Sequence, residues 1–320
     1  MFDAVDLFAG PGGWDVAARG VGLHTVGLEL DAAACATRAA AGHPTIRCDV
    51  AQYPPAPFAG VRHLIASPVC PPFGKSGKKL GLVDLPHVQQ AIDDLAAGRD
   101  TRSVHGAACL DPRSILTAEP MRYLAVLRPE TVCLEQVPSV LPVWHQYTAV
   151  LRRWGYSTAA GILDAADYGL GQHRRRAILV ASRTRDVHLP EPSHGPGLFT
   201  QPHIAMADVI SWGYTQRPAP TVTGGGTATG GAEPFGNGTR RAMRAATGTP
   251  AWSGHPRGVT RPTIAECAAL QGFPADYPWQ GRAGQQYLQV GNAVPPLLAA
   301  AVLTAATGVT AAAPSTLLAA

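Results

Sequence analysis

Short runs of apolar residues recur through residues 1–183 and are separated by stretches with helical spacing. These runs occupy residues 4–8, 24–28, 46–48, 64–67, 131–134 and 177–181. They are continuous rather than alternating, which is typical of strands whose two faces are both covered by helices. The succession of strands and helices therefore predicts an α/β fold with a mostly parallel sheet of the Rossmann-like kind.

Residues 184–260 differ in character, because Pro, Gly and Thr dominate and helical periodicity disappears. A linker would share this composition, but the segment also contains large core-forming side chains: Ile204, Ile210, Trp212, Tyr214, Phe235 and Trp252. Disordered segments are poor in such residues. We therefore predict a large domain over 1–183, a small loop-rich domain over 184–260, and a segment over 261–320 that returns to the large domain.

Three further segments have patterns that predict local structure: two helices near the end of the chain and a loop in its first half. Thr263 and Glu266 have the spacing of a capping box that opens a helix, and residues 294–307 have the pattern of a final helix. Residues 87–102 are polar and only partly helical in pattern, and we expect a mobile loop there.

The charge is unevenly placed along the chain. The net charge is +4, but residues 172–261 contain eleven Lys and Arg against four Asp and Glu, whereas the remainder has fifteen against eighteen. A basic segment on a mildly acidic body suits a polyanionic partner that docks at one region. A solubilised surface would give the same balance, so charge alone leaves both readings open.

Cysteine spacing and hydropathy limit the class of protein. The six cysteines stand far apart without a CxxC pair, which argues against a zinc site or a disulfide framework and favours a reducing cytoplasm. The sequence has no run of eighteen apolar residues, and its start lacks the pattern of a signal peptide. We expect neither a bound metal nor a membrane span.

A glycine-rich segment directly follows the first apolar run. Residues 6–14 read D-L-F-A-G-P-G-G-W, which would let the backbone turn tightly against a ligand at the start of a helix. Glu29 and Asp49 end the next two strands, where carboxylates can accept hydrogen bonds from ribose hydroxyls or an adenine amino group. On spacing alone, ordinary solvated acids or a nicotinamide site would also fit.

The candidate chemical groups follow later strands. Cys70 lies on a loop with three prolines and precedes Lys75, Lys78 and Lys79, which would favour a thiolate and attract phosphate. Cysteines are also often buried for packing alone. Glu135 ends another strand. Strand alternation would direct Arg174 and Arg176 to one side and Arg175 to the other.

Taken together and in order, these segments resemble the cytosine-C5 DNA methyltransferase family over nearly the whole chain. Residues 6–14 resemble its opening motif, 68–73 its catalytic loop, 135–137 its E-N-V tripeptide and 172–176 its Q-x-R-x-R. Residues 266–274 and 291–295 resemble its L-Q-G-F-P and G-N-A-V-P motifs. Departures from the usual residues are Val69, Pro71, Gly74, Gln136 and Ala265.

The resemblance implies methyl transfer from S-adenosyl-L-methionine, which becomes S-adenosyl-L-homocysteine, to C5 of cytosine in double-stranded DNA. It implies that the Cys70 thiolate adds to C6 of a flipped-out base, that Glu135 acts on N3, and that Arg174 lies near O2. Gln172 and Arg176 complete the catalytic set. The implied cofactor residues are Phe8, Ala9, Gly10, Gly12, Gly13, Trp14, Glu29, Leu30, Asp49, Val50, Pro68, Asn292, Ala293 and Val294.

The basic segment corresponds by analogy to the target-recognition region of the family. Its candidate DNA contacts, with those of the Cys70 loop, are Lys75, Lys78, Lys79, Arg217, Arg240, Arg241, Arg244 and Arg257. The resemblance further implies a monomeric enzyme in the cytoplasm of a bacterium or phage-infected cell, with a cognate restriction endonuclease as a possible companion. Three alternatives stay open: a tRNA cytosine-C5 methyltransferase, a catalytically weak DNA-binding homologue, and a nicotinamide oxidoreductase.

Overall fold

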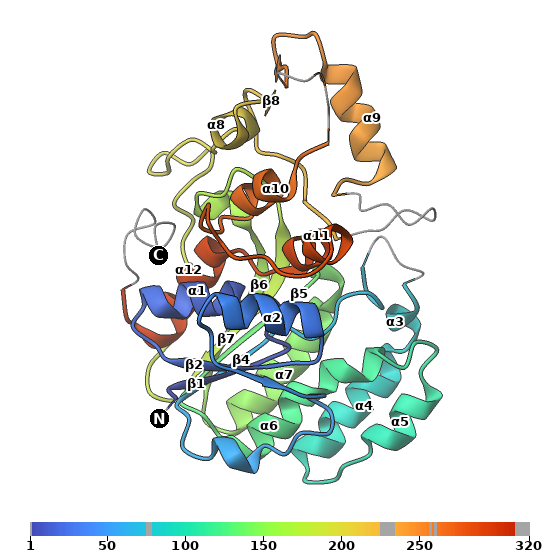
Figure 1. Cartoon of the computed structure of the whole chain (residues 1–320). Coiled ribbons are helices and arrows are strands. Elements are labelled where there is room, and N and C mark those ends of the chain that lie inside the picture. The colour runs from blue at the N-terminus through green and yellow to red at the C-terminus, as the bar shows by residue number, and fades with distance from the viewer. Residues whose placement is uncertain (1, 75–78, 225–233, 256–257, 259–260, 311–320) are drawn as a thin grey trace.

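A seven-stranded sheet forms the centre of the chain in a computed structural model that describes residues 2–74, 79–224, 234–255, 258 and 261–310 (Figure 1). The strand order is β3-β2-β1-β4-β5-β7-β6. The strands are β1 (Ala4–Leu7), β2 (Thr25–Glu29), β3 (Thr45–Arg47), β4 (His63–Ala66), β5 (Thr131–Gln136), β6 (Ser157–Asp164) and β7 (Arg175–Ser182). All six predicted strands are confirmed within a residue or two at their ends.

The sheet is parallel from β3 to β5, and β7 runs antiparallel between β5 and β6. The chain winds outward from β1 to β3 and then returns to place β4 on the other side of β1. This reversal creates a switch point between β1 and β4, and open α/β sheets bind ligands outside the carboxyl ends of their strands at such a point. The predicted Rossmann-like α/β fold is therefore confirmed.

The strand β6 was absent from the pattern that predicted the others. Its residues S-T-A-A-G-I-L-D contain only two large apolar side chains. The strand lies at the edge of the sheet, and most of its residues are only partly buried or exposed. A strand that is not covered on both faces does not need a continuous apolar run, so this strand carries a weaker signal.

Helices cover both faces of the sheet (Figure 1). On one face α1 (Gly13–Gly20) packs against α12 (Pro296–Thr307) in one apolar cluster. On the other, α4 (Leu85–Ala96), α6 (Glu119–Leu127) and α7 (Leu141–Arg153) share the main core with the strands. The remaining helices of this part are α2 (Ala32–Ala40), α3 (Leu80–Val83) and α5 (Arg102–Ala108).

The mobile loop predicted over residues 87–102 is wrong. Most of that segment is helix α4, which buries Val88, Ala91, Ile92 and Leu95 in the main core. These positions have the i, i+3, i+4, i+7 spacing of a core-facing helix, which the surrounding polar residues obscure. The turn after α4 is also anchored, because Asp94 accepts hydrogen bonds from Arg99 and Thr101.

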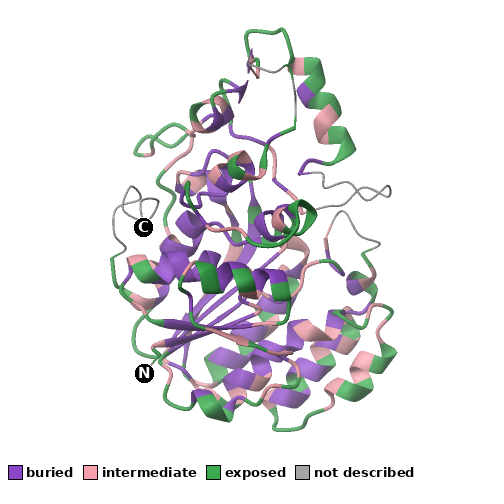
Figure 2. Ribbon diagram, in the orientation of Figure 1, coloured by how far each residue is buried: buried purple, intermediate pink, exposed green. Residues whose placement is uncertain are grey.

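The part of the chain after β7 builds a third apolar cluster at one end of the molecule (Figures 1 and 2). It contains α8 (Met206–Ile210), β8 (Gly213–Tyr214), α9 (Asn237–Ala246) and β9 (Trp252–Ser253). The described core formers predicted here are buried, apart from Ile204, which is partly buried. The cluster also includes residues of α10 (Ile264–Leu270) and α11 (Ala283–Asn292), so these helices share its core. The proposed domain boundaries stay a prediction.

One stretch, Ala283–Thr307, is long and apolar enough to cross a membrane by length and composition alone. It comprises α11 and α12, and 72% of its most apolar window is buried inside the structure. Core helices pass the same test, and a single stretch of this kind is weak evidence for a span.

Candidate active site

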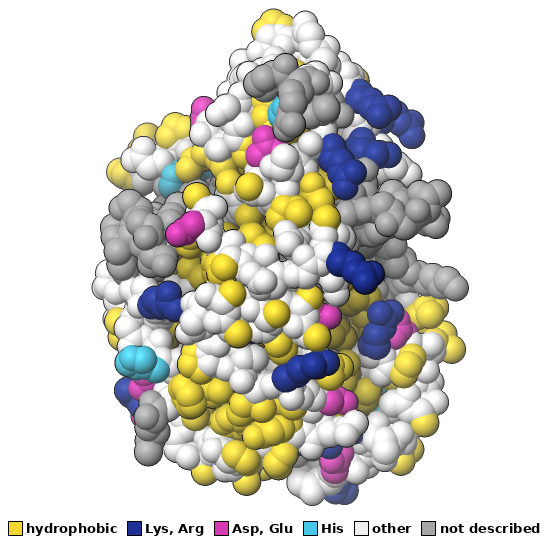
Figure 3. Space-filling model, viewed as in Figure 1, with side chains coloured by type: hydrophobic (Ala, Val, Ile, Leu, Met, Phe, Trp, Pro, Cys, Tyr) yellow, Lys and Arg dark blue, Asp and Glu magenta, His cyan; other side chains and the backbone are white. Residues whose placement is uncertain are grey.

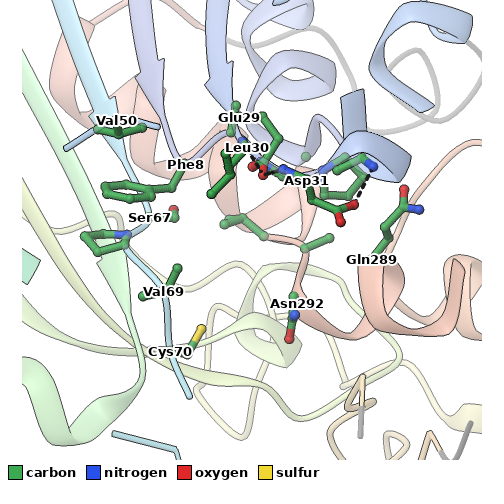
Figure 4. A pocket seen from close by; sticks show the side chains of 18 of the residues that line it. Phe8, Glu29, Leu30, Asp31, Val50, Ser67, Val69, Cys70, Gln289 and Asn292 are labelled. Atoms are coloured by element: carbon green, nitrogen blue, oxygen red, sulfur yellow. Dashed lines mark hydrogen bonds between the residues drawn. The ribbon is translucent and has the colours of Figure 1, made fainter. Parts of the chain in front are cut away.

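A pocket of about 260 Å³ opens at the carboxyl ends of β1, β2 and β4, beside the switch point. Its walls come from the turn after β1, from the ends of β2 and β4, and from residues around the α11–α12 junction. Figure 4 shows Glu29 and Asp31 toward one end and Cys70 toward the other. The two groups of predicted residues, those for a cofactor and those for chemistry, therefore meet in one cavity.

The glycines of the turn after β1 are required by close contacts. Gly12 has φ 107°, and a Cβ there would lie 2.7 Å from both His43 and Tyr277. A Cβ on Gly13 would lie 2.0 Å from the carbonyl oxygen of Val294. Only glycine permits this approach, which brings the turn against the junction that leads into α12.

Glu29 is fixed in place by main-chain hydrogen bonds. Its carboxylate accepts from the backbone N–H of Gly10 at 2.8 Å, of Leu30 at 2.8 Å and of Asp31 at 2.7 Å. Asp31 in turn caps α2 by accepting from Ala34. Glu29, Asp31 and Asp49 all line the pocket, so three carboxylates face the cofactor end of a cavity that is otherwise mainly apolar there.

The cofactor residues implied by the resemblance line this pocket with one exception. Gly12 is absent from the lining because it faces His43 and Tyr277 on the other side of the turn. The sequence reasoning did not name Asp31, Ser67 or Gln289, which also line it. Asp31 could have been suspected because it lies two residues after Glu29, whereas Gln289 lies on α11, far away in the sequence, and left no local signal.

The loop that carries Cys70 is held at its base by Gln136. The side-chain amide of Gln136 donates to the carbonyl oxygens of Pro68 and Val69, both at 3.0 Å, and the residue is fully buried. Beyond the cysteine, the Ser139 hydroxyl donates to the Phe73 carbonyl. The loop stem is therefore tied to the end of β5 on both sides of Cys70.

Glu135 and Arg176 form a buried ion pair beside Cys70. The Nε atom of Arg176 lies 2.8 Å from a carboxylate oxygen of Glu135. Strand alternation directs these side chains as predicted: Arg174 and Arg176 are buried, and Arg175 is exposed. Glu135 lines the pocket together with Cys70.

Arg174 does not have the contacts expected of a residue that reaches into the pocket. Its guanidinium donates to the carbonyl oxygens of Val222 at 3.0 Å, Gly291 at 2.9 Å and Ala293 at 3.0 Å. It therefore joins the start of β7 to the backbone at Val222 and to the α11–α12 junction. Arg176 pairs with Glu135, and both arginines lie near enough to Cys70 to lower its pKa; the role of Arg174 at O2 of the base stays a prediction.

Gln172, like Arg174, connects the start of β7 to distant parts of the chain. Its amide donates to the carbonyl oxygen of Leu270 and to the side chain of Gln271, while its own oxygen accepts from the N–H of Val222. Gln172 and Arg174 thus hold Val222 from two directions. Because both side chains are buried, their hydrogen bonds fix the position of the backbone at Val222.

The electrostatic surroundings of Cys70 favour the neutral thiol. Burial raises the pKa of Cys70, and the nearby Glu135 carboxylate raises it further, whereas Arg176 and Arg174 lower it. The sequence suggested instead that lysines favour the thiolate. Of those lysines, Lys75 and Lys78 lie outside the described residues, and Lys79 is exposed at the start of α3. Burial, with Arg176 nearby, also lowers the pKa of Arg174.

The other predicted DNA contacts lie in the small domain. Arg241 and Arg244 are exposed on α9, and Arg240 donates to Asn237 on the same helix at 3.0 Å. Arg217 stacks on the ring of Tyr214 at 3.7 Å. Arg257 lies outside the described residues. The described residues contain no group of three or more His, Cys, Asp or Glu side chains that could hold a metal ion.

The fold and the pocket define a nucleoside-binding α/β enzyme with a cysteine at one end of its cavity. A family model described as C-5 cytosine-specific DNA methylase matches residues 103–210 and 202–307. The chain belongs to this family and is a DNA cytosine-C5 methyltransferase.

Curated relatives agree with this assignment. The type II methyltransferase M.NgoMIV of Neisseria gonorrhoeae is 26% identical, over 94% of this chain and 96% of the relative. M.NaeI of Lentzea aerocolonigenes is 28% identical, over 94% of this chain and 73% of the relative. The fold is similar to DNMT2 of Spodoptera frugiperda, with a TM-score of 0.63, 16% identity and coverage of 95% and 99%. For Dnmt2 of S. pombe the TM-score is 0.60, with 14% identity and coverage of 95% and 97%.

Proposed function

We propose that this enzyme methylates C5 of cytosine at a short specific site in duplex DNA, through a covalent bond between Cys70 and C6 of a flipped-out base. The observation that carries the proposal is the shared cavity, in which Cys70 and Glu135 face the glycine turn and the carboxylates of the cofactor end. The pairing of Glu135 with Arg176 supplies a positioned charge at the same place.

The pocket suits S-adenosyl-L-methionine by the chemistry of its lining. Apolar side chains such as Phe8, Leu30 and Val50 suit an adenine ring, and Glu29 and Asp49 can accept from ribose hydroxyls and an adenine amino group. When bound, S-adenosyl-L-methionine supplies an electrophilic methyl group on a sulfonium. The residues that hold it would be those of the turn after β1, the ends of β2 and β4, and the α11–α12 junction.

The chemical roles follow from the contacts within this chain. The Cys70 thiolate adds to C6 of cytosine, and Glu135, which has to carry a proton for this step, donates a proton or hydrogen bond to N3 and so neutralises the negative charge that develops on the base. C5 becomes nucleophilic and accepts the methyl group. Transfer of the C5 proton to a water molecule then lets the bond between C6 and the Cys70 sulfur break, and Cys70 leaves as the thiolate. Arg176 holds Glu135 in place through their ion pair, and the family resemblance puts Arg174 near the O2 atom of the base.

The thiol must lose its proton before it attacks, and its surroundings in the free protein oppose that loss. A bound base would exclude water from the pocket and bring its own polar groups to Glu135 and Arg176. Because C5 is inaccessible inside a duplex, the base has to leave the stack, which costs roughly a few kcal/mol. Contacts of the basic small domain with DNA would offset that cost.

The type II names of the relatives support a setting in restriction and modification. We propose that the enzyme acts as a monomer on duplex DNA in a bacterial or phage-infected cytoplasm, and that a cognate restriction endonuclease recognises the same site. A catalytically weak DNA-binding homologue is the second candidate. It is favoured by the substitutions Val69 and Pro71 beside Cys70 and by the raised pKa of that thiol.

The test is methyl transfer from labelled S-adenosyl-L-methionine to mixed-sequence duplex DNA, with nucleoside analysis of the product and tRNA as a second substrate. The wild type and Cys109→Ser, a cysteine outside the pocket lining, should both produce 5-methylcytosine in DNA. Cys70→Ser should produce none while it still binds DNA. Methylation by Cys70→Ser would refute the nucleophile. No label from the wild type on any substrate would favour the DNA-binding homologue.

A further inference from the structure

The helix α9 concentrates positive charge on a part of the chain without acidic residues. Residues 234–265 contain five arginines and no Asp or Glu, and three of these arginines lie on α9. Figure 3 shows Lys and Arg side chains gathered over this helix. An excess of five arginines over these residues suits a polyanion, and duplex DNA is the polyanion of the proposed function, on which this inference rests.

One face of α9 packs against the protein, and the opposite face is exposed to solvent. Met243 is the buried residue of α9, and it belongs to the apolar cluster of the small domain. At 3.6 residues per turn, Asn237, Arg241 and Arg244 fall within an arc of about 60°, and Met243 lies outside that arc. All three are exposed. The anchoring contact therefore turns a polar stripe toward solvent.

The two outer arginines are available to an external ligand. Among the described residues, the side chains of Arg241 and Arg244 take part in no hydrogen bond or ion pair, whereas the Arg240 side chain donates to Asn237. Both project from a regular helix, so their spacing along its axis is fixed. A guanidinium with two parallel N–H donors matches the O6 and N7 acceptors of guanine.

The dimensions of α9 fit the major groove of DNA and not the minor groove. Its ten residues give a length of about 15 Å. The major groove of B-form DNA, about 12 Å wide, admits an α-helix, whereas the minor groove, about 6 Å wide, does not. Figure 1 shows α9 and α3, the helix that follows the Cys70 loop, on the same side of the molecule. A duplex with its target cytosine near Cys70 can thus also meet α9.

We propose that α9 lies in the major groove beside the target cytosine, and that Arg241 and Arg244 read guanines there and set the methylated sequence. The proposal assigns base contacts to these two residues rather than phosphate contacts. It predicts that the recognition sequence contains guanines whose selection depends on each arginine separately.

The experiment uses a duplex library randomised around a central cytosine. The library is methylated by the full chain and read by bisulfite sequencing for the wild type, Arg241→Ala, Arg244→Ala and Arg244→Lys. Arg153→Ala, an exposed arginine at the end of α7, is the matched control. Each alanine variant should lose about 5- to 150-fold preference for one guanine position and keep the others.

The lysine variant separates base reading from phosphate contact. Lysine keeps the positive charge but lacks the planar pair of donors, so a base-reading Arg244→Lys should relax the same position as Arg244→Ala. A phosphate contact would survive the change to lysine. The proposal is overturned if the preferred sequence is unchanged in the alanine variants while binding weakens equally on all sequences and its salt dependence falls by about one ion.

A parallel selection by binding makes the result independent of turnover. Each variant is also prepared on a Cys70→Ser background, and the bound fraction of the library is sequenced. Guanine preferences that vanish with Arg241→Ala or Arg244→Ala support the proposal even if no variant methylates DNA, in which case only the proposed chemistry fails. Methylation that proceeds with unaltered preferences refutes the role of α9 and leaves the chemistry intact. Thermal unfolding of each variant confirms that it is folded.

Discussion

The amide of Gln136 is expected to set the position of the nucleophile. Gln136→Ala removes both hydrogen bonds to the stem of the Cys70 loop, those to Pro68 and Val69, and leaves their carbonyl oxygens without these donors. The site is fully buried, so water does not readily replace them. The resembled family has asparagine here, whose side chain is shorter by one carbon–carbon bond of about 1.5 Å.

The expected free-energy cost of Gln136→Ala follows from the loss of these two hydrogen bonds. Each contributes about 0.5–1.5 kcal/mol net, so losing both costs about 1–3 kcal/mol. If this free energy is lost from the loop conformation in which Cys70 reacts, methyl transfer slows about 5- to 150-fold. In Gln136→Asn, the two 3.0 Å contacts would lengthen to about 4.5 Å unless the loop moves, which is beyond hydrogen-bond range. We expect this variant to resemble Gln136→Ala.

The assay is the single-turnover rate of methyl transfer at saturating DNA and cofactor, with unfolding in urea as the measure of stability. Gln146→Ala is the control, because Gln146 donates to the carbonyl oxygen of Gln89 between α7 and α4, away from the pocket. It should lower stability without slowing methyl transfer. If Gln136→Ala loses as much stability as the control yet keeps a rate within about twofold of wild type, the positioning argument fails.

Three further predictions concern the thiol, the helix junction and the cofactor. Because the pKa of Cys70 is raised above its ordinary 9.0, its alkylation by iodoacetamide should rise about tenfold per pH unit from pH 7 to 8.5; a rate that levels off below pH 8 would contradict this. Gly291→Ala places a Cβ 1.9 Å from the Gly224 nitrogen, so it should destabilise the fold by about 1–3 kcal/mol in urea, unlike Gly284→Ala, whose Cβ meets open space. Glu29→Gln should weaken cofactor binding about tenfold or more by calorimetry with DNA affinity retained; unchanged cofactor affinity would remove Glu29 from that site.

Much of the fold and the cofactor end could be predicted from the sequence, because both depend on local patterns. Continuous apolar runs mark strands covered on both faces, and the order of strands and helices then limits the topology. The glycine turn and Glu29 lie directly after such runs, so their meeting at the carboxyl edge of a parallel sheet followed from the strand assignment. The edge strand β6 and the helix α4 escaped because exposed and polar residues weaken their periodicity.

The partners of the charged side chains were decided only by the tertiary structure. The sequence placed Arg174 and Arg176 on one side of a strand, but it did not show which groups each of them contacts within the protein. The fold brings Glu135 to Arg176, and it brings the carbonyl oxygens of Val222, Gly291 and Ala293 to Arg174. Such contacts join segments far apart in the chain, and a buried guanidinium takes whatever acceptors the packing supplies. The raised pKa of Cys70 has the same origin, because burial and a neighbouring carboxylate exist only once the chain has folded.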